Sequence, residues 1–374
     1  MLELDLSEEQ EAIRAMVTRL GMDTLAPASR SAQSDLAVPP EVWRAMADTG
    51  LVAPVPAELG GGGVPDVLSS LIAAEGLAHG DAAIAMAAIA SGAAAVLIGL
   101  AATDDQQASL LPPVVADNGW RGSVALYEGF GRAPSEYRTT VRREGSTWRV
   151  TGRKVAVPFG SAADVLVVVG TDPSTDGRLR AALVPARDPG ILVQSVAPQM
   201  GLEAAPLSTI ELDVAVPDDQ IVGGASSDPG VLSRVVSRLR LLPAAVALGA
   251  AQRAREYAAG YANERVAFGR PISSFQGVSF LMAEAQVQID AARLEIWKVA
   301  SSVETADPAT LEAAVSRAVS HAGSVAAGTA RDALQVLGGH GFITDHPVER
   351  WYRATASLGA LDFDPMAVSL ASAL

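Results

Sequence analysis

The stretch that decides the fold is residues 264–276, which read ERVAFGRPISSFQ. It interrupts a segment that is otherwise rich in alanine and in other residues that favour helices. Pro271 cannot sit inside a helix, and Gly269 supplies a flexible joint. The sequence therefore predicts that one long helix ends near Phe268 and that another begins near Ser274, with Ser274 as its N-cap.

Two polar side chains flank this corner. Arg265 offers a rigid guanidinium and Gln276 offers an amide, which together suit a diphosphate and its neighbouring groups. A second block follows at residues 335–342, which read QVLGGHGF, and residues 347–353 continue it as PVERWYR. The alternative is that Gly338 and Gly339 only end a helix and that Arg265 is a solvated charge.

These two blocks resemble the acyl-CoA dehydrogenase family. The first matches the family pattern R-x-x-F-G-x-x-x-x-x-F-Q in full, and the second matches Q-x-x-G-G-x-G-[YF]. Residues 6–10 and 56–61 also look like the family, so the resemblance covers essentially the whole chain. It implies an FAD cofactor that lies across a subunit boundary. The residues that the resemblance implies for the ADP portion are Arg265, Phe268, Phe275, Gln276, Gln335, Gly338 and Gly339.

The motifs that the family uses around the flavin ring are altered here. Where the family has T-E-P-x-x-G-S-D, residues 127–134 read YEGFGRAP, and only Glu128 clearly survives. Where the family has G-x-K-x-W-I-[TS]-N, residues 152–159 read GRKVAVPF. Ala156 replaces the tryptophan that stacks on the flavin, and Pro158 replaces a hydroxyl residue and removes a backbone donor. The ring half of the site is therefore expected to be weakened.

The catalytic base that the resemblance implies is altered as well. Asp362 falls where the family carries a glutamate, and its side chain is one methylene shorter. It is the candidate catalytic residue, although it also fits an exposed turn near the C-terminus. Arg240 matches a family arginine and is the candidate substrate-binding residue. Arg238, Arg240, Arg253 and Arg255 put basic charge on one helix, which either serves an anionic nucleotide or forms a solvated face.

Hydrophobic periodicity predicts an N-terminal helical domain, a small central β-barrel or sandwich, and a C-terminal helical bundle of four helices. This order agrees with the α+β fold that the resemblance to the acyl-CoA dehydrogenases implies. The predicted domains are residues 1–119, 120–226 and 227–374. Alternation with period two begins near Trp120, and helical periodicity returns from Asp228. Residues 82–102 carry no charge and are as long as a membrane span, but their many alanines favour a buried helix, or two helices broken at Ser91–Gly92.

The composition narrows the possible partners. The formal net charge of −14 argues against binding to nucleic acid or to an anionic membrane. The chain has no cysteine, which excludes disulfides and a thiol nucleophile, and its four histidines show no metal-ligand spacing. The N-terminus has no basic region typical of a secretion signal, so a cytoplasmic location is expected.

We expect a subunit that takes part in α,β-dehydrogenation of an acyl-CoA thioester. The altered ring half favours an α2β2 assembly in which this chain completes the FAD site of a catalytic partner subunit. The alternatives are a self-sufficient homotetramer that uses Asp362 as base, and a non-catalytic scaffold or acyl-CoA-binding protein. The resemblance also implies an electron-transferring flavoprotein as the electron acceptor.

Overall fold

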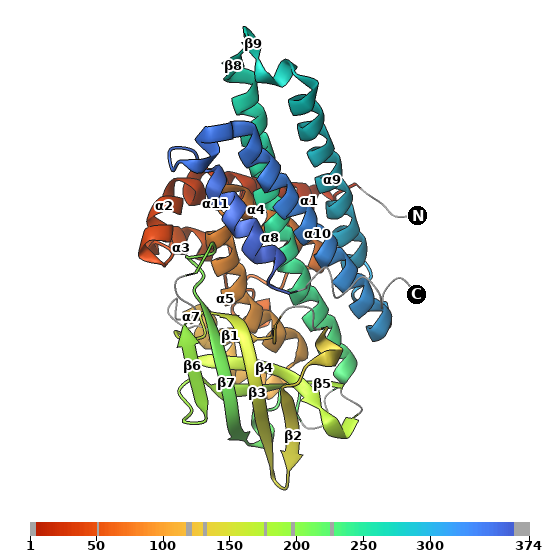
Figure 1. Cartoon of the computed structure of the whole chain (residues 1–374). Coiled ribbons are helices and arrows are strands. Elements are labelled where there is room, and N and C mark those ends of the chain that lie inside the picture. Colours follow the sequence, from red (N-terminus) through yellow and green to blue (C-terminus); the bar gives the residue numbers. More distant parts are fainter. Residues whose placement is uncertain are drawn as a thin grey trace.

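A computed structural model of the chain describes residues 5–50, 52–116, 122–129, 133–175, 178–195, 199–224 and 228–362. Two sets of helices pack against each other, and a β-rich part lies at one end of the elongated molecule (Figure 1). This order of helices, strands and helices confirms the predicted fold class. The predicted boundaries at 119/120 and 226/227 fall in stretches outside the described residues, so the exact division stays a prediction.

The N-terminal helices begin with a capping box. Ser7 Oγ accepts a hydrogen bond from the Gln10 backbone amide, and the Gln10 side chain accepts one from the Ser7 amide. The elements of this part are α1 (Glu8–Leu20), a π-helical turn (Gly21–Leu25), α2 (Ala26–Asp35), α3 (Pro40–Ala47), α4 (Val67–Gly80), α5 (Ala82–Ala101), α6 (Asp104–Leu110) and α7 (Pro112–Ala116).

Helix α5 is the apolar segment with the length of a membrane span. Of its most apolar window, 72% is buried inside the protein, where it contacts α4, α8 (Pro229–Glu264) and β1 (Gly122–Ala125). The Asp81 carboxylate caps it by accepting hydrogen bonds from the amides of Ala83 and Ile84. It runs without the break considered at Ser91–Gly92. The alanines let the neighbouring helices approach closely, which is how a core helix of this composition is stabilised.

The described residues of the β part form one curled, seven-stranded sheet. Its order is β1–β4–β2–β3–β7–β6, and β5 pairs with β4. A tight turn at Gly145, whose φ is 63°, joins β2 to β3. The remaining strands are β2 (Thr140–Glu144), β3 (Thr147–Pro158), β4 (Val165–Asp172), β5 (Arg178–Pro185), β6 (Ile191–Ser195) and β7 (Leu207–Val216).

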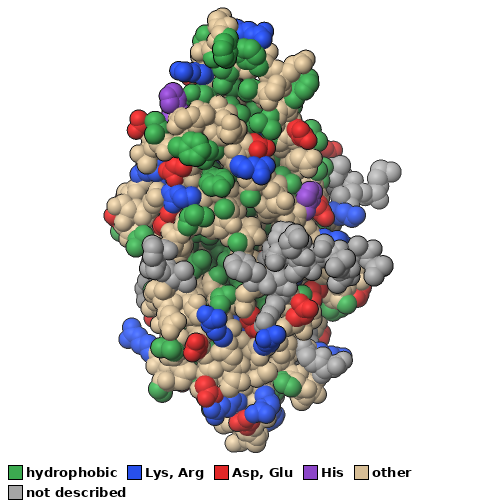
Figure 2. All heavy atoms as spheres, in the orientation of Figure 1, with side chains coloured by type: hydrophobic (Ala, Val, Ile, Leu, Met, Phe, Trp, Pro, Cys, Tyr) green, Lys and Arg blue, Asp and Glu red, His purple; other side chains and the backbone are tan. Residues whose placement is uncertain are grey.

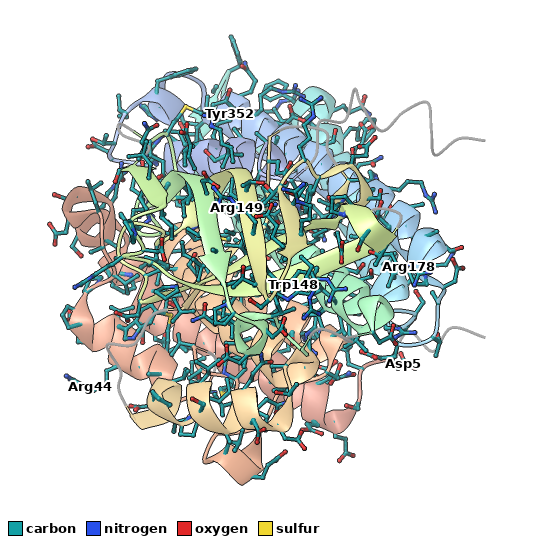
Figure 3. The ribbon with its side chains drawn as sticks, turned by 90° about the horizontal axis from the view of Figure 1, so that it is seen from below. Asp5, Arg44, Trp148, Arg149, Arg178 and Tyr352 are labelled. Carbon is teal, nitrogen blue, oxygen red and sulfur yellow. The ribbon has the colours of Figure 1, made fainter. Side chains whose placement is uncertain are left out.

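The sheet encloses a small core of its own and also packs against the helices. Val141, Val150 and Leu166 are fully buried in that inner core, whereas Val167 and Val169 on β4 belong to the main core with the helices. Side chains therefore alternate between two buried environments. Seen from below, the sheet spreads across the helices, and Trp148 and Arg149 occupy successive positions of β3 (Figure 3).

The C-terminal helices form the predicted bundle. Helix α8 is the central element, since it contacts α4, α5, α9, α10 and α11. Its small residues, among them Ala245, Ala247 and Ala250, are buried and permit this crowding. The other helices are α9 (Gln276–Ala300), α10 (Pro308–Leu337) and α11 (Val348–Gly359). These bounds agree with the return of helical periodicity from Asp228 onward that the sequence shows.

The corner between α8 and α9 corrects one detail of the sequence prediction. Helix α8 ends at Glu264, and α9 begins at Gln276. Between them lies a short β-hairpin whose strands are β8 (Val266–Ala267) and β9 (Arg270–Pro271). Ser274 is not the N-cap, because its hydroxyl donates to the Pro271 carbonyl and Phe275 occupies the cap position. The hairpin turns at Gly269, whose φ is 79°, and it projects from the top of the molecule (Figure 1).

Candidate functional site

The predicted ADP-binding residues gather at the projecting tip, and we call this set the nucleotide corner: Arg265, Phe268, Phe275, Gln276, Gln335, Gly338 and Gly339. Arg265 and Gln276 lie at the two ends of the hairpin, and both are exposed. Phe268 is 95% exposed, and its ring packs edge-to-face against the Phe275 ring, with the two ring centres 6.2 Å apart. The Arg270 guanidinium lies 4.1 Å from the Phe275 ring centre and fixes that side of the turn.

The second sequence block reaches the same end of the molecule. Tyr261 on the last turn of α8 and His340 share a hydrogen bond of 2.7 Å, which joins the residues after α10 to the base of the hairpin. Gly338 has φ of 57° and ψ of −132°, a conformation that only glycine adopts easily. A Cβ atom at Gly338 or Gly339 would meet nothing within 4 Å, so the backbone here faces open space.

The polar side chains of the nucleotide corner remain available. Among the described residues, the side chains of Arg265, Gln276 and Gln335 have no hydrogen-bond or ion-pair partner, and all three are exposed. An exposed guanidinium, two amides and open glycine backbone are groups that suit a diphosphate. The tip carries hydrophobic side chains flanked by basic ones in the space-filling view (Figure 2). This part of the chain fits the ADP portion of a dinucleotide.

The residues predicted around the flavin ring lie in the β part, and there they bind one another. The Lys154 ammonium donates to the Leu126 carbonyl and to Glu128, both at 2.9 Å, and the side chains of Lys154 and Glu128 are 0% and 2% exposed. Glu128 also accepts from the backbone amides of Arg138 and Thr139. Burial lowers the pKa of Lys154 to about 8, and the Glu128 carboxylate opposes that shift.

Strand β3 bends where the family carries its stacking tryptophan. The register between β3 and β7 shifts between Lys154 and Val157, and Ala156 inside this bulge has φ of 51°. The carbonyl of Pro158 accepts a hydrogen bond of 2.5 Å from the Ser123 hydroxyl on β1. The segment therefore offers neither an aromatic face at Ala156 nor a backbone N–H at Pro158, and it fits a flavin ring poorly.

The two candidate catalytic and substrate-binding residues form one buried ion pair. Arg240 Nε lies 2.9 and 3.2 Å from the two carboxylate oxygens of Asp362, and Arg240 Nη2 donates to Ser316. The side chains of Arg240 and Asp362 are 0% and 2% exposed, which is incompatible with the exposed-turn interpretation of Asp362. Burial alone would lower the pKa of Arg240, but the Asp362 carboxylate outweighs it and raises that pKa. Burial raises the pKa of Asp362, and Arg240 only partly opposes this.

Two further findings were not anticipated from sequence. Tyr127 and Tyr137 are buried beside this ion pair, and burial holds both phenol pKa values well above their usual range. Arg238 and Arg240 are 5% and 0% exposed, so the interpretation of this stretch as a solvated face is wrong for both. The only signal for this was the apolar sequence on either side of them, LSRVVSRLRLLP, at residues 232–243.

We call the described residues of 127–134 and 152–159 that are predicted to surround the flavin ring the ring-side residues. They lie far from the nucleotide corner within one chain. Tyr127 and Pro158 line a cavity together with Leu239 and Leu242 of α8. From Leu242 to Arg265 the helix rises by about 35 Å, at 1.5 Å per residue. The nucleotide corner and the cavity beside Tyr127 and Pro158 therefore lie at opposite ends of this part of α8. The fold thus gathers the residues of the nucleotide corner in one place and the ring-side residues in another. It does not bring these two sets together within one chain.

Comparison with known proteins agrees with this architecture. The family models for the N-terminal, middle and C-terminal domains of acyl-CoA dehydrogenase match residues 7–118, 128–215 and 230–362. The short-chain specific acyl-CoA dehydrogenase of Clostridium acetobutylicum is 31% identical, and the match covers 94% of this chain and 93% of that protein. A probable acyl-CoA dehydrogenase of Bacillus subtilis is 30% identical over the same share of each chain.

Solved structures give the same result. The structure of butyryl-CoA dehydrogenase from Megasphaera elsdenii superposes with a TM-score of 0.83 at 25% identity, covering 100% of this chain and 99% of that one. A chain in a structure titled electron transferring flavoprotein of Acidaminococcus fermentans superposes with a TM-score of 0.84 at 26% identity, covering 100% and 98%. The chain therefore belongs to the acyl-CoA dehydrogenase family of flavin-dependent oxidoreductases.

Proposed function

We propose that this chain is a subunit of an FAD-dependent acyl-CoA dehydrogenase that supplies the nucleotide corner for FAD while a second, catalytic subunit supplies the ring site and the base. The observation that carries the proposal is an asymmetry between the two halves. The polar side chains of the nucleotide corner are exposed and free to bind a ligand. In contrast, the side chains predicted for the flavin ring and the base are buried in two ion pairs, Lys154–Glu128 and Arg240–Asp362.

The nucleotide corner supports an interface between subunits. It projects from the body of the molecule, about 35 Å along α8 from the ring-side residues. A dinucleotide held at Arg265 and Gln276 must place its flavin ring against another chain. The exposed aromatic ring of Phe268 and the exposed Phe280 on the first turns of α9 add apolar surface for that neighbour.

The ring-side residues support a loss of catalytic function in this chain. A base that abstracts a proton needs a carboxylate oxygen that substrate can reach. Both Asp362 oxygens lie within 3.2 Å of Arg240 Nε, and the side chain is 2% exposed. Lys154 and Glu128 likewise satisfy each other and hold the strand segment that carries Ala156.

The reaction we propose for the assembly is α,β-dehydrogenation of an acyl-CoA thioester. Bound FAD supplies a hydride acceptor in this chemistry. This chain's part is to hold the diphosphate through Arg265 and the amides of Gln276 and Gln335, and to let backbone approach closely at Gly338 and Gly339. The short-chain acyl-CoA dehydrogenase relatives support an acyl-CoA substrate, and the structural likeness to the Acidaminococcus chain supports an electron-transferring flavoprotein as acceptor.

The second candidate is a homotetramer that uses Asp362 itself. The raised pKa of Asp362 favours it, because a general base works best when its pKa is near the working pH. In that case Arg240 would have to release the carboxylate when substrate binds. The third candidate, a scaffold or acyl-CoA-binding protein without flavin, is disfavoured by the retained nucleotide corner. The cytoplasmic location expected from the sequence stays a prediction.

Flavin stoichiometry tests the proposal. The chain is produced alone and together with a family member that has an intact ring motif and a catalytic glutamate, and FAD per chain is measured from absorbance after dialysis. We expect little flavin and poor solubility for the chain alone, because half of its site and its apolar tip are unpaired. A stable homotetramer with one FAD per chain would refute the heteromeric assembly.

A further inference from the structure

Two tyrosines on adjacent turns of α8 bind two histidines of the segment between α10 and α11. The Tyr261 hydroxyl lies 2.7 Å from His340 Nδ1, and the Tyr257 hydroxyl lies 2.8 Å from His346 Nδ1. The two imidazole rings stack on each other, with their centres 5.5 Å apart and an angle of 16° between their planes. We call these four residues the tyrosine–histidine clamp. It attaches both ends of the segment 340–346 to α8.

The rings of the clamp also pack edge-to-face. The centre of the Tyr261 ring lies 5.9 Å from that of His340 and 5.7 Å from that of His346, and the Tyr257 ring lies 6.0 Å from His346. Trp351 on α11 packs against Tyr257 in the same way, at 5.5 Å. Each ring of the clamp therefore contacts at least two others, so the position of one restrains the rest.

Tyr261 connects the two halves of the nucleotide corner. Its backbone carbonyl accepts a hydrogen bond of 2.8 Å from the amide of Arg265, and its hydroxyl binds His340, which directly follows Gly339 in the sequence. Tyr257 lies one helical turn further from Arg265. Tyr261 is thus hydrogen-bonded both to Arg265 itself and to the neighbour of Gly339.

The segment that carries Gly338 and Gly339 has little stiffness of its own. Three of the four residues 338–341 are glycine, which gives the backbone its widest range of conformations. A ligand that binds the Arg265 guanidinium and this backbone together needs a fixed distance between them. That constraint must come from contacts outside the segment, and the clamp supplies one from the side of α8.

We propose that Tyr261 and His340 are positioning residues for the nucleotide corner. They fix the distance between the Arg265 guanidinium and the backbone of Gly338 and Gly339, and they act on the nucleotide only through these neighbours. This inference rests on the proposed function, because it needs the nucleotide corner to hold FAD.

The affinity of the purified assembly for FAD tests the proposal, measured by calorimetric titration after the flavin has been removed. Tyr261→Phe removes the hydroxyl and keeps the ring. Tyr257→Phe is the matched control, because it removes the same group from a hydrogen bond of nearly the same length. We expect Tyr261→Phe to raise the dissociation constant of FAD about 3- to 10-fold, as loss of one hydrogen bond does, and Tyr257→Phe to raise it less than about twofold.

Urea unfolding of the same two variants separates positioning from stability. Both should lower the unfolding midpoint to a similar extent, because each loses one hydrogen bond between the same two segments. Equal dissociation constants of FAD in the two variants would show that the clamp only stabilises the fold, and the proposal would be wrong.

Substitutions of His340 provide an independent arm, which decides the matter if Tyr261→Phe does not fold. His340→Asn keeps an acceptor near the position of Nδ1 and should retain most of the affinity for FAD. His340→Leu removes the acceptor and should weaken FAD binding as much as Tyr261→Phe does. Equal affinity in the asparagine and leucine variants would contradict a role for this hydrogen bond.

The double variant Tyr261→Phe/Arg265→Ala shows whether Tyr261 acts through Arg265. If it does, the combined increase in the dissociation constant should be smaller than the product of the two single increases. An increase equal to that product would contradict the proposal. Arg265→Ala alone distinguishes the two levels of failure: full FAD affinity in that variant would refute the nucleotide corner and this inference with it. Full affinity in Tyr261→Phe beside a weakened Arg265→Ala would refute this inference alone.

Discussion

The ion pair between Arg240 and Asp362 decides whether this chain has a base of its own. Removing one member of a buried pair leaves the other charge unpaired, which typically costs about 3–5 kcal/mol. The pair is 122 residues apart in sequence and joins α8 to the segment after α11. Its first effect is therefore to fix the C-terminal segment on the bundle, and catalysis would have to compete with that structural contribution.

Asp362→Asn separates the structural role from the catalytic one. If the partner subunit carries the base, turnover per bound flavin should change less than about twofold, whereas loss of a general base costs roughly 10²–10⁴-fold. Stability should fall, and the double variant Arg240→Met/Asp362→Leu should recover most of it because apolar residues replace both charges. Urea unfolding measures the stability, and a large turnover loss with FAD still bound would establish Asp362 as the base.

Arg265→Ala tests the nucleotide corner at its most specific contact. Loss of a charge-assisted, two-pronged contact with a diphosphate costs about 1.5–3 kcal/mol, which is roughly a 10- to 100-fold increase in the dissociation constant of FAD. The amount of flavin that the assembly retains after dialysis measures this loss of FAD affinity. Arg331→Ala is the matched control, because Arg331 is an exposed arginine on α10 whose one ion pair within the described part of the chain is with its neighbour Asp332. Equal flavin retention in both variants would exclude Arg265 as a cofactor contact.

Helix α9 presents an apolar stripe that the described chain leaves uncovered. Phe280, Val287 and Leu294 follow one another at seven-residue intervals on one face, and they are 65%, 65% and 38% exposed. Residues at this spacing share one side of a helix, as at helix–helix contacts. The stripe starts one turn beyond Gln276, so it continues the surface on which we expect a neighbouring subunit.

Val287→Asp should therefore weaken the assembly. Exposing a buried valine costs roughly 1.5–3 kcal/mol, and placing a charge in an apolar contact adds to this. Light scattering should show a smaller mass at the same concentration. Gln288→Asp is the matched control, since it adds the same charge at the next exposed position of the same helix. An unchanged mass for Val287→Asp would mean that this face is not an interface.

At the scale of the whole molecule, the main feature is the distance between the nucleotide corner and the ring-side residues. Helix α8 holds the nucleotide corner at one end and contacts the ring-side cavity near Leu242, about 35 Å away. Because this spacing is built into a single helix, bending or local rearrangement cannot close it within the chain. We therefore expect a complete flavin site to need a second subunit, whether identical or not.

The sequence by itself determined the order of helices and strands, the fold family and the tip between α8 and α9. These depend on periodicity, proline, glycine and local motifs, which act over a few residues. Only the tertiary structure decided that Asp362 is paired with Arg240, that Lys154 is paired with Glu128, and that Arg238 is buried without a carboxylate. Charged side chains follow no local rule of this kind, since their partners depend on which distant segments the fold brings together and on how much water it excludes.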